Sequence, residues 1–144
     1  MTKIFAGNTQ RKIPHIYHGK STPLLVLEQL NKDMDVVARF TIPQIPATGV
    51  SVSRPGAEEG SIRLSDSLKE ACTVSQCHIR IGLDEKGFFF NEKVNGTTNG
   101  VYLYSGEKVC GASIHDGMIV YLGDQAVRFV LSEGSMAGAT RIRD

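Results

Sequence analysis

Apolar and polar residues alternate in several short runs along the chain. Between residues 36 and 42, Val, Ala, Phe and Ile stand at every second position, and the run 77–83 repeats the pattern with Cys, Ile, Ile and Leu. In the run 126–131, Val, Phe and Leu share one face. A period of two residues is that of a strand with one buried face. The pattern therefore predicts β-strands at these places, and no run has the length and period of an amphipathic helix.

Shorter apolar runs between turn-forming residues predict further strands. These runs span residues 24–30, 49–53, 62–64, 88–90, 101–104, 107–110 and 118–122. The intervening turns include two Asn-Gly pairs, at 95–96 and 99–100, which favour tight turns with positive φ. Ser67 to Glu70 has the spacing of a helical capping box and predicts one helical turn before Thr73. About ten short strands with regular turns predict an all-β sandwich or barrel.

The length of 144 residues predicts one domain with a sizeable core. Residues 1–20 are polar and basic with little periodicity, so we expect a flexible N-terminal arm. The predicted β-domain spans residues 21–132, and residues 133–144 are expected to form a C-terminal tail.

Charge and composition narrow the classes of partner. The chain has 16 Lys and Arg against 15 Asp and Glu, a net charge of +1, so no broad positive surface favours nucleic acid or an anionic membrane. No apolar run approaches the roughly 20 residues that span a bilayer, and the N-terminus lacks a sustained apolar segment. Three cysteines are too few for a disulfide framework. These observations predict a cytoplasmic protein that neither inserts into a membrane nor binds nucleic acid.

The candidate binding residues lie at three loop positions, each at the end of a predicted strand. Arg54 ends one strand, Ser75 precedes the strand at 77–83, and Thr98-Asn99-Gly100 lies between two predicted hairpins. Exposed side chains on loops held by a rigid scaffold are the usual place for binding residues.

In order and spacing, these positions resemble the forkhead-associated (FHA) domain family. That family has a strand ending in Gly-Arg, then Ser-x-x-His about twenty residues later, then Asn-Gly about twenty further. An Asp-Gly turn and a strand ending in Leu-Gly follow. The matching residues here are Ser53-Arg54, Ser75-Gln76-Cys77-His78, Thr98-Asn99-Gly100, Asp116-Gly117 and Leu122-Gly123. The match runs from about Leu24 to Leu131.

The resemblance implies a β-sandwich of about eleven mostly antiparallel strands whose loops bind phosphothreonine peptides. Arg54 and Ser75 would contact the phosphate, Gln76 would flank it, and Thr98 would face it. Asn99 would hold the peptide backbone. His78 and Gly100 would have structural roles.

The chain departs from the family pattern at four positions. Ser53 replaces glycine, Gln76 replaces a residue that is often basic, Val101 replaces threonine, and Met118 replaces aspartate. There is also a second register, because Asn95-Gly96-Thr97 is a literal Asn-Gly-Thr match. In that register Asn95 and Thr97 would take the roles of Asn99 and Thr98. We favour the register of Thr98 and Asn99, because the sequence after Gly100 fits the family better.

A metal site and a catalytic triad are two alternatives that the sequence supports less well than a peptide-binding site. A metal site from Cys72, Cys77, His78 and Cys110 lacks the usual ligand spacing, since the first two cysteines are five residues apart. A Ser75, His78 and Asp84 triad lacks a nucleophile elbow, and three residues along one strand do not converge. We therefore expect no catalytic residue, no metal and no cofactor.

The sequence thus predicts a non-enzymatic module that binds a phosphothreonine-containing protein or peptide, within a Ser/Thr kinase signalling or assembly pathway. The alternative is an FHA-like assembly domain that binds partners independently of phosphate. The departures at Gln76 and Val101 motivate that alternative.

Overall fold

The computed structural model describes residues 24–42, 44–57 and 62–132. The predicted arm, 1–20, and the predicted tail, 133–144, lie outside the described residues. The described residues form ten strands and one short 3₁₀ helix. In chain order these are β1 (Leu24–Leu30), β2 (Val36–Ile42), β3 (Val50–Ser53), β4 (Ile62–Arg63), η1 (Lys69–Thr73), β5 (Ile79–Asp84), β6 (Gly87–Glu92), β7 (Val101–Leu103), β8 (Gly111–Ser113), β9 (Ile119–Leu122) and β10 (Gln125–Ser132).

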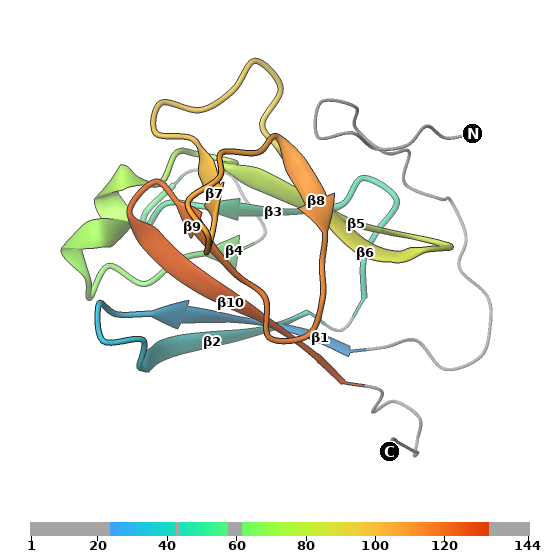
Figure 1. Cartoon of the computed structure of the whole chain (residues 1–144), viewed down its shortest axis with the longest axis horizontal. Helices are drawn as coiled ribbons and strands as arrows, with labels where there is room; N and C mark the ends of the chain where they lie inside the picture. Colours follow the sequence, from blue (N-terminus) through green and yellow to red (C-terminus); the bar gives the residue numbers. More distant parts are fainter. Residues whose placement is uncertain (1–23, 43, 58–61, 133–144) are drawn as a thin grey trace.

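The strands form two five-stranded sheets (Figure 1). The first sheet has the order β2-β1-β10-β9-β7, and all its neighbours are antiparallel. The second has the order β4-β3-β5-β6-β8, and only β3 and β4 are parallel. In the first sheet the start of β1 pairs with the end of β10, with Leu24 opposite Ser132.

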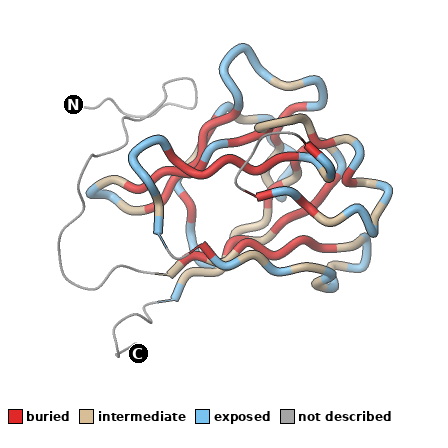
Figure 2. Tube along the Cα trace, turned by 180° about the vertical axis from the view of Figure 1, so that it is seen from behind, coloured by how far each residue is buried: buried red, intermediate tan, exposed pale blue. Residues whose placement is uncertain are grey.

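The core lies between the two sheets and explains the alternating pattern of the sequence. Leu25, Leu27 and Phe129 of the first sheet are fully buried, as are Ile79 and Ile81 of the second. The rings of Phe90 and Phe129 stack across the sheets with their centroids 6.0 Å apart. Figure 2 shows buried segments along the strands and exposed turns at their ends. The all-β sandwich predicted from the sequence is confirmed.

The segment 77–83 differs from its prediction at its start. Strand β5 begins at Ile79, because Cys77 has φ 53° and belongs to a turn. His78, predicted to lie on a polar face, is fully buried. The strand signal in Ile79, Ile81 and Leu83 was correct, but the first two residues of the run were assigned wrongly.

Three smaller predictions need correction. The helical turn before Thr73 exists as η1, but its N-cap is Leu68 and no side chain caps it, so the capping box is absent. The predicted strand 107–110 is reduced to a single bridge between Tyr102 and Lys108. Strand β8, at Gly111–Ser113, was not predicted.

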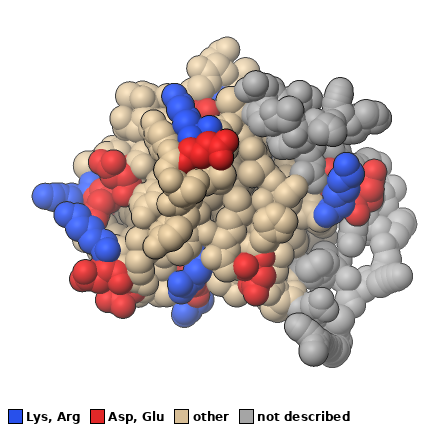
Figure 3. Space-filling view, viewed as in Figure 1, with Lys and Arg blue, Asp and Glu red and all other residues tan. Residues whose placement is uncertain are grey.

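Charged residues of both signs are scattered over the face shown in Figure 3, without a continuous area of one sign.

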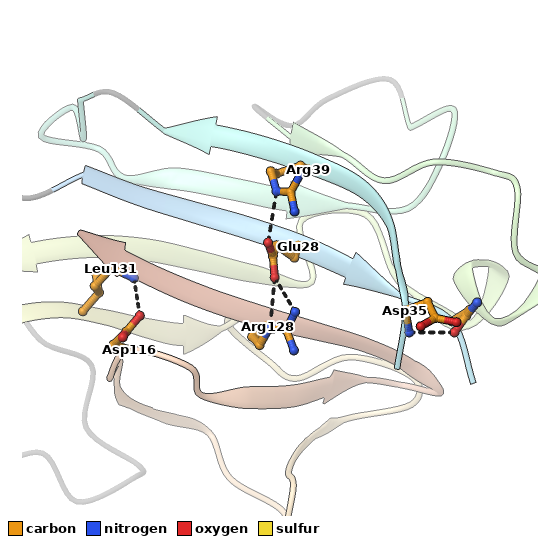
Figure 4. Close-up of polar contacts among 7 residues, drawn as sticks. Glu28, Asp35, Arg39, Asp116, Arg128 and Leu131 are labelled. Atoms are coloured by element: carbon orange, nitrogen blue, oxygen red, sulfur yellow. Dashed lines mark hydrogen bonds and ion pairs between the residues drawn. The ribbon is translucent and has the colours of Figure 1, made fainter. Parts of the chain in front are cut away.

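On the outer face of the first sheet, Glu28 of β1 lies between Arg39 of β2 and Arg128 of β10 (Figure 4). Its carboxylate accepts from Arg39 Nε at 3.0 Å and from Arg128 Nη2 at 2.8 Å. Among the described residues, no helix is long and apolar enough to cross a membrane.

Candidate functional site

Arg54 immediately follows β3 and lies beside the loop that contains Ser75. The Arg54 backbone N–H donates to Ser75 O at 3.3 Å, and Arg54 O accepts from Ala57 N at 3.2 Å. The Arg54 side chain is exposed, and no described residue forms a hydrogen bond or ion pair with it. The two residues that the sequence places about twenty positions apart are therefore neighbours, with the guanidinium accessible to a ligand.

The Ser75–His78 loop is also held by Ser53. Ser53 is fully buried, and its hydroxyl accepts a hydrogen bond from Cys77 N at 2.9 Å. A buried hydroxyl and a turn N–H would each be costly without a partner. The serine that departs from the family glycine thus fixes the loop in which Ser75 and Gln76 lie. Gln76 is partly exposed and forms no side-chain hydrogen bond with the described residues.

His78 joins two of the three loops through its buried ring. Its Nδ1 accepts from Ser75 N at 2.9 Å, which places the ring proton on Nε2. The Nε2–H then donates to Gly100 O at 2.8 Å. Burial lowers the pKa of His78 below its ordinary value of 6.5, and Lys93 acts in the same direction, while the Gly100 contact and Glu92 oppose them. Because main-chain groups engage both ring nitrogens, the ring serves as a brace and leaves no free nitrogen for a general base.

Glu92 and Thr97 hold the 93–100 loop from within. Glu92 is nearly buried at the end of β6, and its Oε2 accepts from Thr97 N at 3.0 Å and from Thr97 Oγ1 at 2.6 Å. The Thr97 hydroxyl oxygen in turn accepts from Gly100 N at 3.0 Å. Asn95, the other residue of the alternative register, is exposed in a turn with φ 75°. The Thr97 hydroxyl is therefore engaged by Glu92, by Gly100 N and by His78 Nε2, which lies 3.2 Å away.

Thr98 and Asn99 lie on the exposed side of the same loop. The Asn99 amide Nδ2 donates to Thr73 O at 2.9 Å, which ties the loop to the end of η1. Thr98 forms no side-chain hydrogen bond with the described residues. Hydrogen bonds thus connect all three predicted loop positions, and Arg54, Ser75 and Asn99 belong to one cluster.

A fourth segment, the β9–β10 turn of the first sheet, closes on this cluster. Gly123 N donates to Gly100 O at 3.0 Å, and Asp124 N donates to Thr73 Oγ1 at 2.8 Å. Gly123 has φ 66°, and a Cβ there would lie 2.6 Å from Thr73 Oγ1. Only glycine allows this approach. The Leu-Gly motif noted in the sequence therefore marks the point where the first sheet meets the loops of the second.

Glu92 and Thr73 were not among the predicted site residues. Both act through partners far along the chain or in a neighbouring loop, so neither stands out in a spacing pattern. Thr73 had one usable signal, its place two residues before Ser75.

Within the described ranges, no group of three or more His, Cys, Asp or Glu side chains could hold a metal ion.

No family model matches the sequence, and no curated protein matches it. Solved structures do. An FHA domain from an Arabidopsis thaliana hypothetical protein matches with a TM-score of 0.60 and 18% identity, over 85% of this chain and 99% of that one. The FHA domain of the Chlamydia trachomatis CT664 protein matches with a TM-score of 0.56 and 18% identity, over 74% and 96%. An FHA domain analysed for phosphothreonine-dependent interactions matches with a TM-score of 0.56 and 16% identity, over 74% and 95%. The chain therefore has the forkhead-associated fold.

Proposed function

We propose that this protein binds phosphothreonine-containing peptides through Arg54, Ser75, Gln76, Thr98 and Asn99. The observation that supports the proposal is the hydrogen-bonded cluster of three loops, in which the Arg54 backbone contacts Ser75, His78 contacts Gly100, and the Arg54 side chain is exposed. A similar fold that takes part in phosphothreonine-dependent interactions gives further support. We expect the partner to be a protein phosphorylated by a Ser/Thr kinase, and the module to act without catalysis.

The exposed groups suit a phosphate chemically. A phosphothreonine has a charge of about −1.5 to −2 and three strongly accepting oxygens. The Arg54 guanidinium can donate two parallel hydrogen bonds to such a group, and the Ser75 and Thr98 hydroxyls can donate to the remaining oxygens. Each hydrogen bond to a charged group contributes roughly 1.5–3 kcal/mol. After the cost of association, a few such bonds predict micromolar affinity.

The contacts within the 93–100 loop favour Thr98 and Asn99 over the alternative pair, Asn95 and Thr97. The Thr97 hydroxyl already donates to Glu92 and accepts from Gly100 N. Asn99 uses its amide N–H on Thr73 O, which leaves Asn99 Oδ1 to accept a backbone N–H from a bound peptide. These contacts support the proposal that Thr98 and Asn99, rather than Thr97 and Asn95, contact the peptide.

The proposal is tested by titrating matched phosphothreonine, phosphoserine and unphosphorylated peptides against the full chain. We expect micromolar binding of the phosphothreonine peptide and roughly fivefold weaker binding of phosphoserine, because one buried methyl is worth about 1 kcal/mol. No measurable binding is expected without the phosphate. Arg54→Ala should weaken phosphopeptide binding at least roughly tenfold while leaving the urea unfolding midpoint within error, because its side chain is exposed.

Lys86→Ala is the matched control, since Lys86 is an exposed cation in the β5–β6 turn. This variant should bind like the wild type. Equal affinity for phosphorylated and unphosphorylated peptides, or normal binding by Arg54→Ala, would reject the proposal and favour the phosphate-independent assembly domain.

A further inference from the structure

A cavity of about 320 Å³ on the outer face of the second sheet has a free thiol in its wall. Its lining residues are Cys77, Arg80, Asn91, Glu92, Lys93 and Val94. Cys77 is half-buried, and within the described part of the chain its thiol forms no disulfide and no hydrogen bond. The cavity volume is at the lower end of the range for small-molecule sites. A small ligand in this cavity would therefore lie beside a free sulfur atom.

The backbone of Cys77 is fixed relative to the rest of the cavity. Its N–H donates to the buried Ser53 Oγ at 2.9 Å. The next residue, His78, donates its N–H to Val52 O and accepts at its own carbonyl oxygen from Lys93 N. Hydrogen bonds through His78 thus hold the thiol and Lys93 in one frame.

The charges around the cavity favour an anionic ligand. Arg80 and Lys93 are exposed, and Arg80 uses one guanidinium nitrogen on Thr48 O, which leaves its other donors available. The one carboxylate in the lining, that of Glu92, is nearly buried and accepts both Thr97 donors. The charges that face solvent in this cavity are therefore positive.

Asn91 adds an acceptor without a partner. The residue is 8% exposed, and its Oδ1 has no hydrogen-bond partner among the described residues. A buried amide oxygen without a partner is unfavourable, and native structures rarely keep one without a reason. Because the last torsion of an asparagine side chain is broad, the amide can turn to accept from an N–H group placed in the cavity. The lining thus suits a molecule that has both carboxylates and an amide N–H.

We propose that Cys77 is a modification site, at which a peptide-like thiol with free carboxylates forms a mixed disulfide and occupies this cavity. The Cys77 thiolate attacks one sulfur of the corresponding low-molecular-weight disulfide. A bond forms between Cys77 Sγ and that sulfur, the original S–S bond breaks, and the second half leaves as a thiolate that takes up a proton. The Cys77 sulfur is oxidised and the leaving sulfur is reduced. Arg80 and Lys93 attract the carboxylates, and Asn91 Oδ1 accepts the amide N–H.

The test treats the full chain with limiting glutathione disulfide, which has carboxylates and amide N–H groups, or with the neutral hydroxyethyl disulfide. After alkylation of the remaining thiols, mass spectrometry of the digested protein measures the rate of mixed-disulfide formation at each cysteine. Cys72 and Cys110 are exposed and do not line the cavity, so they are internal controls. The rate ratio of glutathione disulfide to hydroxyethyl disulfide should be about threefold to tenfold higher at Cys77 than at either control, and this advantage should shrink as salt rises.

Two lysine variants test the part that the cavity charges play. Lys93→Ala should lower the rate at Cys77 with glutathione disulfide about threefold to fivefold and leave the rate with hydroxyethyl disulfide unchanged. Lys86→Ala, which removes the same charge from the β5–β6 turn, should change neither rate.

Equal rate ratios at Cys72, Cys77 and Cys110 would overturn the proposal, because the cavity would then have no preference for its ligand. Equal reductions by Lys93→Ala and Lys86→Ala would also overturn it, since the effect would be one of net charge. The same fractional reduction with both disulfides in Lys93→Ala would overturn it as well, because Lys93 would then act on the thiol and not on the carboxylates.

Discussion

His78 is the residue through which the loop cluster depends on pH. Its ring is fully buried and accepts the Ser75 N–H at Nδ1. Burial lowers its pKa below the ordinary value of 6.5, so the folded protein resists a proton that the unfolded chain accepts. The stability that His78 contributes is therefore fully present above about pH 6.5 and is lost as the pH falls from 6.5 through the lowered pKa.

Urea unfolding between about pH 5 and 8 should reveal this dependence. In the wild type, the free energy of unfolding should fall below pH 6.5 by up to about 1.4 kcal/mol per pH unit from this residue. His78→Gln should be less stable at neutral pH by about 1–3 kcal/mol and should lose this slope. His115→Gln alters an exposed imidazole and should keep the slope. An unchanged slope in His78→Gln would show that another group is responsible.

Individual residues of the candidate site differed in how far the sequence could predict them. Arg54, Ser75 and Asn99 follow from motif order, because motifs mark exposed positions on separate loops. The roles of Ser53 and Glu92 do not follow. Ser53 accepts from a distant backbone group, Cys77 N, and Glu92 accepts from Thr97 N through a loop conformation that the sequence does not specify. Ser53 looked like a departure from the family pattern, yet its hydroxyl binds the loop that contains Ser75.

Strand β1 depends on a cross-strand charge group as well as on its buried leucines. The side chain of Glu28 is 8% exposed and lies between Arg39 and Arg128 on the two neighbouring strands. Burial acts to raise the pKa of Glu28, but the hydrogen bonds and charges of the two arginines outweigh it, so the pKa is lowered from 4.5. Its contribution to stability is present above about pH 4.5 and is lost as the pH falls through the lowered pKa.

Glu28→Gln should lower the free energy of unfolding at neutral pH by about 1–3 kcal/mol, because it leaves two arginines beside a neutral group. The difference from the wild type should shrink between neutral pH and an acidic pH below the lowered pKa of Glu28, where the wild-type carboxylate has gained its proton. Urea unfolding at both pH values measures the difference. Glu85→Gln, in the exposed β5–β6 turn, should have little effect. A pH-independent difference for Glu28→Gln would contradict an ionic role.

Strands with strong alternation were predictable, and strands defined only by their neighbours were not. The alternation in β2 and β10 reflects one face packed on the core, so it is visible in the sequence. Strand β8 consists of Gly, Ala and Ser and has no such pattern. It is a strand because it pairs with Phe89, Phe90 and Asn91 of β6. Cys77 fits the alternating pattern by chance, but its backbone has the positive φ of a turn and not the extended conformation of a strand.

The β9–β10 turn of the first sheet contacts η1 and the 93–100 loop beside the candidate site. Gly123 of the β9–β10 turn packs directly on Thr73, and Thr73 O accepts the Asn99 amide. The position of Asn99 therefore depends on how the whole sandwich closes.

Gly123→Ala should test this dependence. The added Cβ would lie 2.6 Å from Thr73 Oγ1 and 2.7 Å from Thr73 O, and the residue would also have to keep φ 66°. We expect a loss of about 2–4 kcal/mol in the free energy of unfolding. Phosphopeptide affinity should fall as well, because Thr73 must move. Urea unfolding and peptide titration measure the two effects.

Gly117→Ala is the matched control for backbone strain. Gly117 has φ 83°, but no described residue lies within 4 Å of an added Cβ. Gly117→Ala should lower the free energy of unfolding by only about 1–2 kcal/mol, the cost of an alanine in the left-handed conformation, and should leave peptide affinity unchanged. Equal losses for the two variants would show that the contact with Thr73 is unimportant.

The pairing of Leu24 with Ser132 has a consequence for how this module can be combined with other proteins. The first residue of β1 and the last residue of β10 lie side by side, at the end away from η1 (Figure 1). Seven residues of β1 separate them, by about 20 Å, from the turn next to the loop cluster. A host protein needs only two attachment points about 5 Å apart to accept the module as an insert. The loop cluster proposed to bind the peptide would then lie at the end of the sandwich opposite both attachment points.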